Sequence, residues 1–221
     1  MNVLIVAPHM DDEVLGAGGA IARHVAAGDR VDVCFVAHRV YEHRFDEVAN
    51  VAERVCALRA RDMLGYREAV FLDLPDERLD LSVQQIIIGL EDTLAKTEPD
   101  IVYLPHRGDN NQDHRAVFDA ARVAFRPVAT PNIQRVLSYE VPSSTEQSPP
   151  IPEAAFLPNG YLDISATLER KLEAFRAYVT EQRDFPHPRS EEALRNLAQR
   201  RGIESGFAAA EAFMILRQRW R

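Results

Sequence analysis

The sequence predicts a single α/β domain in which helices cover both faces of a mostly parallel sheet. Two observations predict it. Short apolar runs rich in β-branched residues alternate with longer amphipathic stretches through the first 125 positions, and 46% of the 221 residues are hydrophobic. Such a chain can bury one full core. Regular alternation of strands and helices is typical of parallel strands joined by right-handed crossovers.

The elements follow in order from this pattern. We expect strands at 3–7, 31–37, 69–74 and 101–104, each followed by a helix, at about 14–27, 46–64, 82–96 and 113–125. Gly28 and Gly65 stand where helices end, and Pro99 stops the third helix. Later in the chain we expect a strand at 134–140 and helices at 165–183 and 190–201, the last beginning at Ser190.

A proline-rich segment, 127–158, interrupts the alternation. A long loop within a compact domain usually has a function. We therefore expect this segment to lie over the site, with the polar residues 143–146 forming a rim. A loop that only covers surface is the alternative.

Charge and composition exclude several classes of protein. The formal net charge is −8 and there is no polybasic run, which argues against nucleic acid or an anionic membrane as a partner. No apolar stretch reaches the roughly 18 to 20 residues needed to span a bilayer, and the apolar run 3–7 is too short for a signal peptide. We therefore expect a cytoplasmic protein, and its oligomeric state, a homo-oligomer included, stays open. We expect Cys34 and Cys56 to be small core residues.

Two predicted strands end in clusters of histidine and aspartate. Pro8-His9-Met10-Asp11-Asp12-Glu13 follows the first strand, and the segment 106–115 follows the fourth. The carboxyl ends of parallel strands meet at one edge of a sheet, so the two clusters can converge. Adjacent buried carboxylates repel each other. A divalent cation would relieve that repulsion, with one carboxylate as ligand and the other acting on a bound water. The alternative is that Asp11 or Asp12 only caps the next helix.

The chain resembles the PIG-L/LmbE-like zinc-dependent de-N-acetylases, in their bacterial sugar-associated branch. Residues 8–13 match the family motif (P/A)-H-x-D-D-E at every defined position, and 113–117 match the end of its second motif. Segments 139–146, 158–165, 186–190 and 201–213 extend the likeness over nearly the whole chain.

This resemblance implies a Rossmann-like fold of the LmbE type and a zinc ion bound by His9, Asp12 and His114. It also implies that Asp11 is the general base. The implied reaction removes an acetyl group from an N-acetylated amino sugar, free or within a nucleotide sugar or glycoconjugate. These three ligands, which supply two nitrogens and one oxygen, could also bind iron(II), cobalt or manganese.

The chain departs from the family at one position. Many members carry His-x-Asp-His, and the first histidine is credited with stabilising the oxyanion, but this chain has Asn111 there. Asn111 itself can donate a neutral hydrogen bond, and His106 and His187 are the other candidates for this role.

Neighbouring polar residues have two interpretations each. Asp113 orients a ligand histidine or the base, or it caps the helix that begins there. Asp109 binds substrate hydroxyls, or it makes an Asx turn after Gly108.

Three arginines are candidates for substrate binding. Arg39 and Arg44 follow the second strand, where a guanidinium can bind a phosphate or a sugar hydroxyl. Arg189, together with His187, has the same interpretation, with a solvated turn as the alternative.

Other functions remain open from the sequence. A thiol-conjugate amidase, or a deacetylase of a biosynthetic intermediate, would use the same ligands. A non-catalytic carbohydrate- or phosphate-binding module is the alternative of another class. Asp11 favours the enzyme, because a binding module does not need a spare carboxylate beside a complete ligand set.

Overall fold

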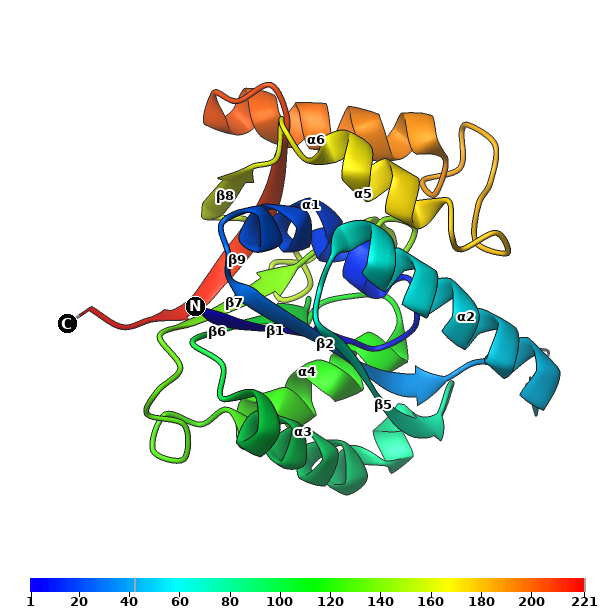
Figure 1. Ribbon diagram of the computed structural model, residues 1–221, viewed down its shortest axis with the longest axis vertical. Helices are drawn as coiled ribbons and strands as arrows, with labels where there is room; N and C mark the ends of the chain where they lie inside the picture. The colour runs from blue at the N-terminus through cyan, green and yellow to red at the C-terminus, as the bar shows by residue number, and fades with distance from the viewer. Residues whose placement is uncertain (42, 221) are drawn as a thin grey trace.

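The computed structural model describes residues 1–41 and 43–220; for Val40, Tyr41 and Arg44 it describes the backbone only. A seven-stranded sheet with the order β5-β2-β1-β6-β7-β9-β8 forms the centre of the molecule (Figure 1). Its strands are β1 (Asn2–Ala7), β2 (Arg30–His38), β5 (Glu68–Pro75), β6 (Ile101–Pro105), β7 (Arg135–Tyr139), β8 (Gly160–Asp163) and β9 (Ala210–Gln218). The first five strands of that order are parallel, whereas β9 runs antiparallel to both β7 and β8.

Helices cover both faces of this sheet, which confirms the predicted fold class. Figure 1 shows α1, α2, α5 and α6 on one side and α3 and α4 on the other. The helices are α1 (Asp12–Ala26), α2 (Glu47–Leu64), α3 (Val83–Thr97), α4 (Gln112–Ala124), α5 (Leu168–Phe175) and α6 (Glu191–Ser205). Two 3₁₀ turns (Leu79–Leu81 and Thr145–Gln147) and a short hairpin of β3 (Val40–Tyr41) and β4 (Arg44–Phe45) complete the described elements.

The two faces of β1 supply two separate cores. Val3, Ile5 and Ala7 pack under α1 and its neighbours, whereas Leu4 and Val6 pack against α3 and α4. A strand that is buried on both faces has a continuous apolar sequence, as expected for the centre of a parallel sheet.

Several helix ends follow the sequence signals. The Asp46 side chain accepts a hydrogen bond from Ala49 N at the start of α2, and Gly65, with φ of 85°, ends that helix. Ser190 caps α6 by accepting from Ala193 N.

The predicted helix 165–183 is wrong in length, because α5 ends at Phe175. Beyond it, Tyr178 donates to Glu13, Thr180 donates to Glu53, and Glu181 pairs with Arg39. These long-range contacts hold the segment in turns and override its local helix propensity.

Strands β8 and β9 were not expected from the sequence. β8 has four residues and is half-buried throughout. In β9 the apolar residues Phe213, Met214, Ile215 and Leu216 are consecutive, so their periodicity does not distinguish a strand from a helix.

Helix α1 contains a kink that distant side chains stabilise. Ala17 has non-helical angles (φ −143°, ψ 16°). The buried Glu211 carboxylate accepts from Gly19 N (2.9 Å) and Ala20 N (2.7 Å), and Lys171 Nζ donates to Leu15 O (2.9 Å). Lys171 and Glu211 lie 2.7 Å apart. This ion pair therefore satisfies backbone groups that the kink releases.

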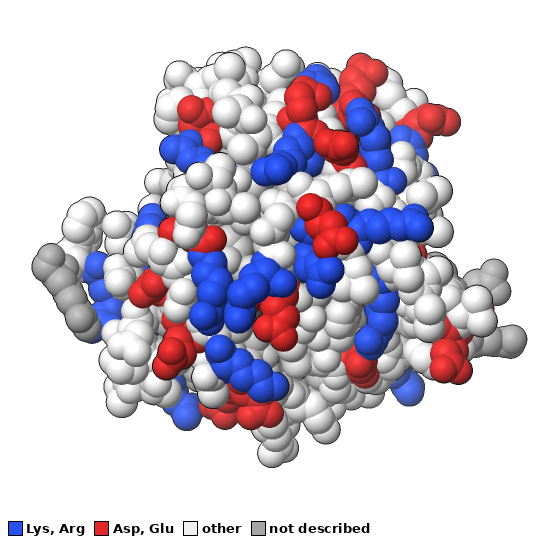
Figure 2. Space-filling view, viewed as in Figure 1, with Lys and Arg blue, Asp and Glu red and all other residues white. Residues whose placement is uncertain are grey.

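On the face shown in Figure 2, positive side chains are interspersed with negative ones and do not form one continuous basic surface. Among the described residues, no helix combines the length and the apolar character needed to cross a membrane.

We expect Lys171→Met to lower the free energy of unfolding by about 3–5 kcal/mol, because it leaves the buried Glu211 charge without its partner. The double variant Lys171→Met/Glu211→Gln should be more stable than Lys171→Met alone, since the uncharged glutamine keeps one oxygen that accepts from α1 and leaves no unpaired buried charge. Urea unfolding measures both. Equal losses in the single and double variants would contradict this role of the ion pair.

Candidate metal centre

A cavity of about 350 Å³ opens at the carboxyl ends of the parallel strands. Side chains reach it from the segments after β1, β2, β5, β6 and β7 and from the connection between α5 and α6; they include His9, Arg39, Asp76, Asn111, Ser144 and Arg189. Strand order reverses between β1 and β6, since β2 lies on the far side of β1. Sites in open α/β sheets form at such a switch point.

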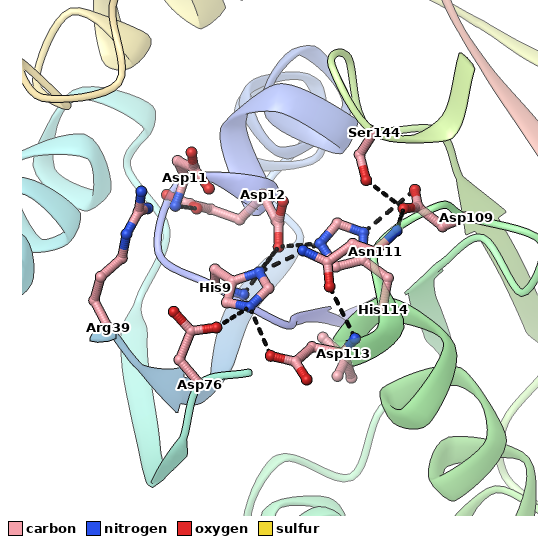
Figure 3. A network of polar contacts seen from close by, with 12 residues as sticks. His9, Asp11, Asp12, Arg39, Asp76, Asp109, Asn111, Asp113, His114 and Ser144 are labelled. Atoms are coloured by element: carbon pink, nitrogen blue, oxygen red, sulfur yellow. Dashed lines mark hydrogen bonds and ion pairs between the residues drawn. The ribbon is translucent and has the colours of Figure 1, made fainter. Parts of the chain in front are cut away.

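Three buried side chains converge on one point at this cavity. His9 Nδ1, Asp12 Oδ2 and His114 Nε2 lie 3.2–3.3 Å from one another, and in Figure 3 the two rings and the carboxylate point toward each other. Three ligands of a tetrahedral ion, each about 2.0–2.1 Å from it, are separated by about 3.3 Å. Both the donor set and its spacing therefore fit a divalent cation.

The turn before α1 does not use its carboxylates as helix caps. Asp11 occupies the N-cap position, but its side chain makes no cap hydrogen bond, and its φ is 123°. Asp12 Oδ2 accepts from His9 N (2.9 Å), and Glu13 Oε2 accepts from Asp11 N (3.1 Å). The cap-only interpretation is thus wrong. A non-glycine residue at such an angle costs on the order of 1–3 kcal/mol and is typical of functional sites.

Within the described part of the chain, the two oxygens of the buried Asp11 carboxylate differ in their contacts. Its Oδ2 lies 3.0 Å from Arg189 Nη1, whereas the buried Oδ1 has no hydrogen-bond partner among the described residues. Burial raises the pKa of Asp11 to about 7, against the opposing effect of the Arg189 guanidinium. A cation bound beside it would lower this pKa.

Glu181 links two arginines at the edge of the cavity. It is buried, pairs with Arg39 Nη2 at 2.6 Å, and also pairs with Arg189. Arg189 Nε in turn donates to Ser143 Oγ (2.7 Å). The sequence did not single out Glu181, because it fell inside a predicted helix.

Two carboxylates face the outer nitrogen of His9. Nε2 lies 3.0 Å from Asp76 Oδ1 and 3.3 Å from Asp113 Oδ2. Asp113 is held by the backbone N–H groups of Glu77 and Leu79. When the proton is on Nε2, the Nδ1 lone pair faces the point where His9, Asp12 and His114 converge. Carboxylates that accept from the outer nitrogen fix this tautomer in histidines that bind metals. Asp76 was missed, although it lies two residues after the predicted parallel strand 69–74.

Asp109 lies behind His114 and not in the cavity. Its Oδ2 is 3.3 Å from His114 Nδ1, and its carboxylate accepts from Ser144 and Thr145. Asn111 N also donates to Oδ1 at 2.8 Å, which is the Asx-turn bond. Burial alone would raise the pKa of Asp109, but the adjacent His114 imidazole and the hydrogen bonds from Ser144 and Thr145 outweigh it and lower the pKa. These contacts leave the carboxylate no room for substrate hydroxyls.

The candidates for oxyanion stabilisation are placed differently. Asn111 lines the cavity, and its Oδ1 caps α4 by accepting from Asp113 N (2.8 Å). Helix capping thus belongs to Asn111 and not to Asp113. His106 Nε2 lies 3.0 Å from Ala154 O, outside the cavity lining, and His187 Nδ1 accepts from Arg189 N (3.0 Å). The predicted role of Arg44 concerns a side chain outside the described part of the chain.

The chain belongs to the PIG-L family: residues 4–125 match the family described as GlcNAc-PI de-N-acetylase. It is 31% identical over 148 residues to the uncharacterized deacetylase YaiS of Escherichia coli K12, covering 65% of this chain and 75% of YaiS. It is also 25% identical over 239 residues to the diacetylchitobiose deacetylase of Thermococcus kodakarensis, covering 97% of this chain and 83% of that one.

Solved structures share the fold. The conserved protein TT1542 of Thermus thermophilus aligns with a TM-score of 0.80 and 23% identity, over 100% of this chain and 97% of its own. The hydratase GalB of Pseudomonas putida KT2440 aligns with a TM-score of 0.73 and 22% identity, over 100% and 98%. The N,N'-diacetylchitobiose deacetylase of Pyrococcus horikoshii aligns with a TM-score of 0.76 and 23% identity, over 97% and 83%. A deacetylase and a hydratase thus share this architecture, so the fold alone does not determine the reaction.

We expect the protein to bind one divalent cation per chain and His114→Ala to lose it. Zinc content after dialysis measures the binding. Saturating zinc should also stabilise the wild type, by about 4 kcal/mol at a free concentration about 1,000 times Kd. His24→Ala is the control, because His24 contacts Asp29 and Tyr103, away from the cavity. Zinc retained by His114→Ala would contradict the ligand assignment.

Proposed function

We propose that the protein is a zinc-dependent hydrolase that removes the acetyl group from an N-acetylated amino sugar, free or within a nucleotide sugar or glycoconjugate. Two features of one cavity carry this proposal. His9, Asp12 and His114 form a triangle that could hold a metal ion, and the adjacent residue Asp11 has a buried oxygen, Oδ1, without a hydrogen-bond partner among the described residues. Membership of the PIG-L family and relatives named as deacetylases support the reaction class.

Zinc is the proposed ion because two imidazoles and one carboxylate form a usual catalytic zinc set with an open position. When bound, zinc supplies a Lewis acid that polarises a carbonyl oxygen and lowers the pKa of water to about 7. Asp76 and Asp113 hold His9, and Asp109 holds His114, in the tautomers that this set requires.

Asp11 carries the proton transfers. Its Oδ1 takes a proton from the water that attacks the acetyl carbon, and it later gives that proton to the departing amine nitrogen as the C–N bond breaks. The products are acetate and the free amine. Arg189 holds Oδ2 throughout, so that Oδ1 is the oxygen that faces the reacting atoms.

The polar lining of the cavity suits a sugar. Arg39, Asp76, Asn110 and Ser143 surround it with donors and acceptors for hydroxyl groups. The side chain of Asn111, at the start of α4, lines the same cavity. We propose that it donates the hydrogen bond to the oxyanion which a histidine provides in many relatives.

We expect Asp11→Asn to lower acetate release by at least about a hundredfold, because the variant keeps the shape of the side chain and loses the base. The assay uses a panel of N-acetylated sugars and UDP-sugars with zinc-reconstituted protein. Zinc content should stay at the wild-type level, which separates loss of the base from loss of the metal. Wild-type activity in the metal-loaded variant would contradict the role of Asp11.

A pair of variants separates the two functions of Asn111. Asn111→Ser keeps an oxygen that caps α4 but removes the amide donor, so kcat should fall by about 10²–10³ while stability stays near the wild type. Asn111→Ala loses both and should also unfold more easily, by about 0.5–2 kcal/mol. Steady-state kinetics and thermal unfolding measure the two effects. An unchanged kcat in Asn111→Ser would remove Asn111 from the mechanism.

A further inference from the structure

The loop after β7 is fastened to the loop after β6 by several contacts. The hydroxyl groups of Ser144 and Thr145 donate to Asp109, and Ser148 Oγ donates to Gly108 O. Gly108 itself lies so close to the loop that a Cβ there would be 2.4 Å from Ala154 O. The proline-rich segment is thus held against the chain that leads to His114.

The Asp109 carboxylate accepts three hydrogen bonds and faces one imidazole nitrogen. Oδ1 accepts from Asn111 N and Ser144 Oγ, and Oδ2 accepts from Thr145 Oγ1 at 2.6 Å and faces His114 Nδ1 at 3.3 Å. A carboxylate offers about four accepting positions. The side chain is fully buried, so these protein groups replace water around the carboxylate.

His114 depends on this carboxylate. Its Nδ1 is buried, and 3.3 Å is an ion-pair distance, not an aligned hydrogen bond. If Asp109 rotated, the imidazole would lose the charge that keeps Nε2 directed at His9 and Asp12. Carboxylates that orient ligand histidines contribute about 10- to 100-fold to metal affinity.

We propose that Ser144 and Thr145 are positioning residues for the metal centre: their hydroxyl groups orient Asp109, which fixes His114 as a ligand. The inference rests on the proposed metal site and extends it to the loop after β7. Ser144 also lines the cavity. The loop that borders the substrate is therefore connected to the metal through two side chains, Asp109 and His114.

Zinc affinity tests this directly, by competition with a chromophoric chelator in the absence of substrate. Ser144→Ala and Thr145→Val should each weaken zinc binding by about tenfold. Thr145→Ser should restore it, because it returns the hydroxyl group, which also accepts from Val141 N (2.8 Å). Ser148→Ala is the matched control, since it loosens the same loop without touching Asp109.

The pattern across the four variants decides the proposal. Weaker binding in Ser144→Ala and Thr145→Val, with Ser148→Ala within about twofold of the wild type, would support it. Equal losses in Ser144→Ala and Ser148→Ala would show a general effect of the loop and overturn it, as would wild-type affinity in all of them. Circular dichroism of the apo proteins confirms that each variant is folded.

The zinc affinities test the role of Ser144 and Thr145 independently of the proposed reaction. If the wild type binds zinc but releases no acetate from any sugar, the proposed function fails while the affinities still decide the role of Ser144 and Thr145. If the wild type binds no zinc, both proposals are overturned.

Discussion

The constraint on which the structure depends is the burial of three consecutive carboxylates, Asp11, Asp12 and Glu13, at the end of β1. Each needs its own compensation, because buried like charges repel and lose their hydration. Asp11 faces Arg189, and Glu13 accepts from Tyr178 Oη at 2.6 Å. Asp12 faces two histidines, and the proposed cation would complete its environment. The centre therefore requires both α4 and the connection between α5 and α6.

The backbone of this turn separates neighbouring carboxylates that would otherwise share one environment. The φ of 123° at Asp11 lets its side chain contact Arg189 while Asp12 accepts from the backbone N–H of His9. The cost of that angle is offset by the packing of α1 on the sheet. There Gly16 allows the ring of Tyr139 to approach, since a Cβ would lie 2.2 Å from its Cδ2. Local strain and long-range packing thus support the same site.

Local patterns predicted the part of the molecule that depends on nearby residues. Strands β1, β2, β5 and β6 and helices α1 to α4 follow from apolar runs and helix-end signals, and His9, Asp12 and His114, which a motif marks, lie together. Glu181 and the position of Asp109 were not predictable, because both depend on contacts with side chains far away in the sequence. Asp109 looks like a loop carboxylate in sequence, and only its hydroxyl partners place it behind His114.

The position of the ion decides which side chains are its ligands and which is the base, and anomalous X-ray diffraction at the zinc edge measures that position most directly. Two groups of side chains share His9: Nδ1 with Asp12 and His114, and Nε2 with Asp76 and Asp113. We predict one peak per chain, about 2.0–2.2 Å from His9 Nδ1, Asp12 and His114. A peak between His9 Nε2, Asp76 and Asp113, or no peak in zinc-soaked crystals, would contradict the assignment of Asp11 as the base beside the metal.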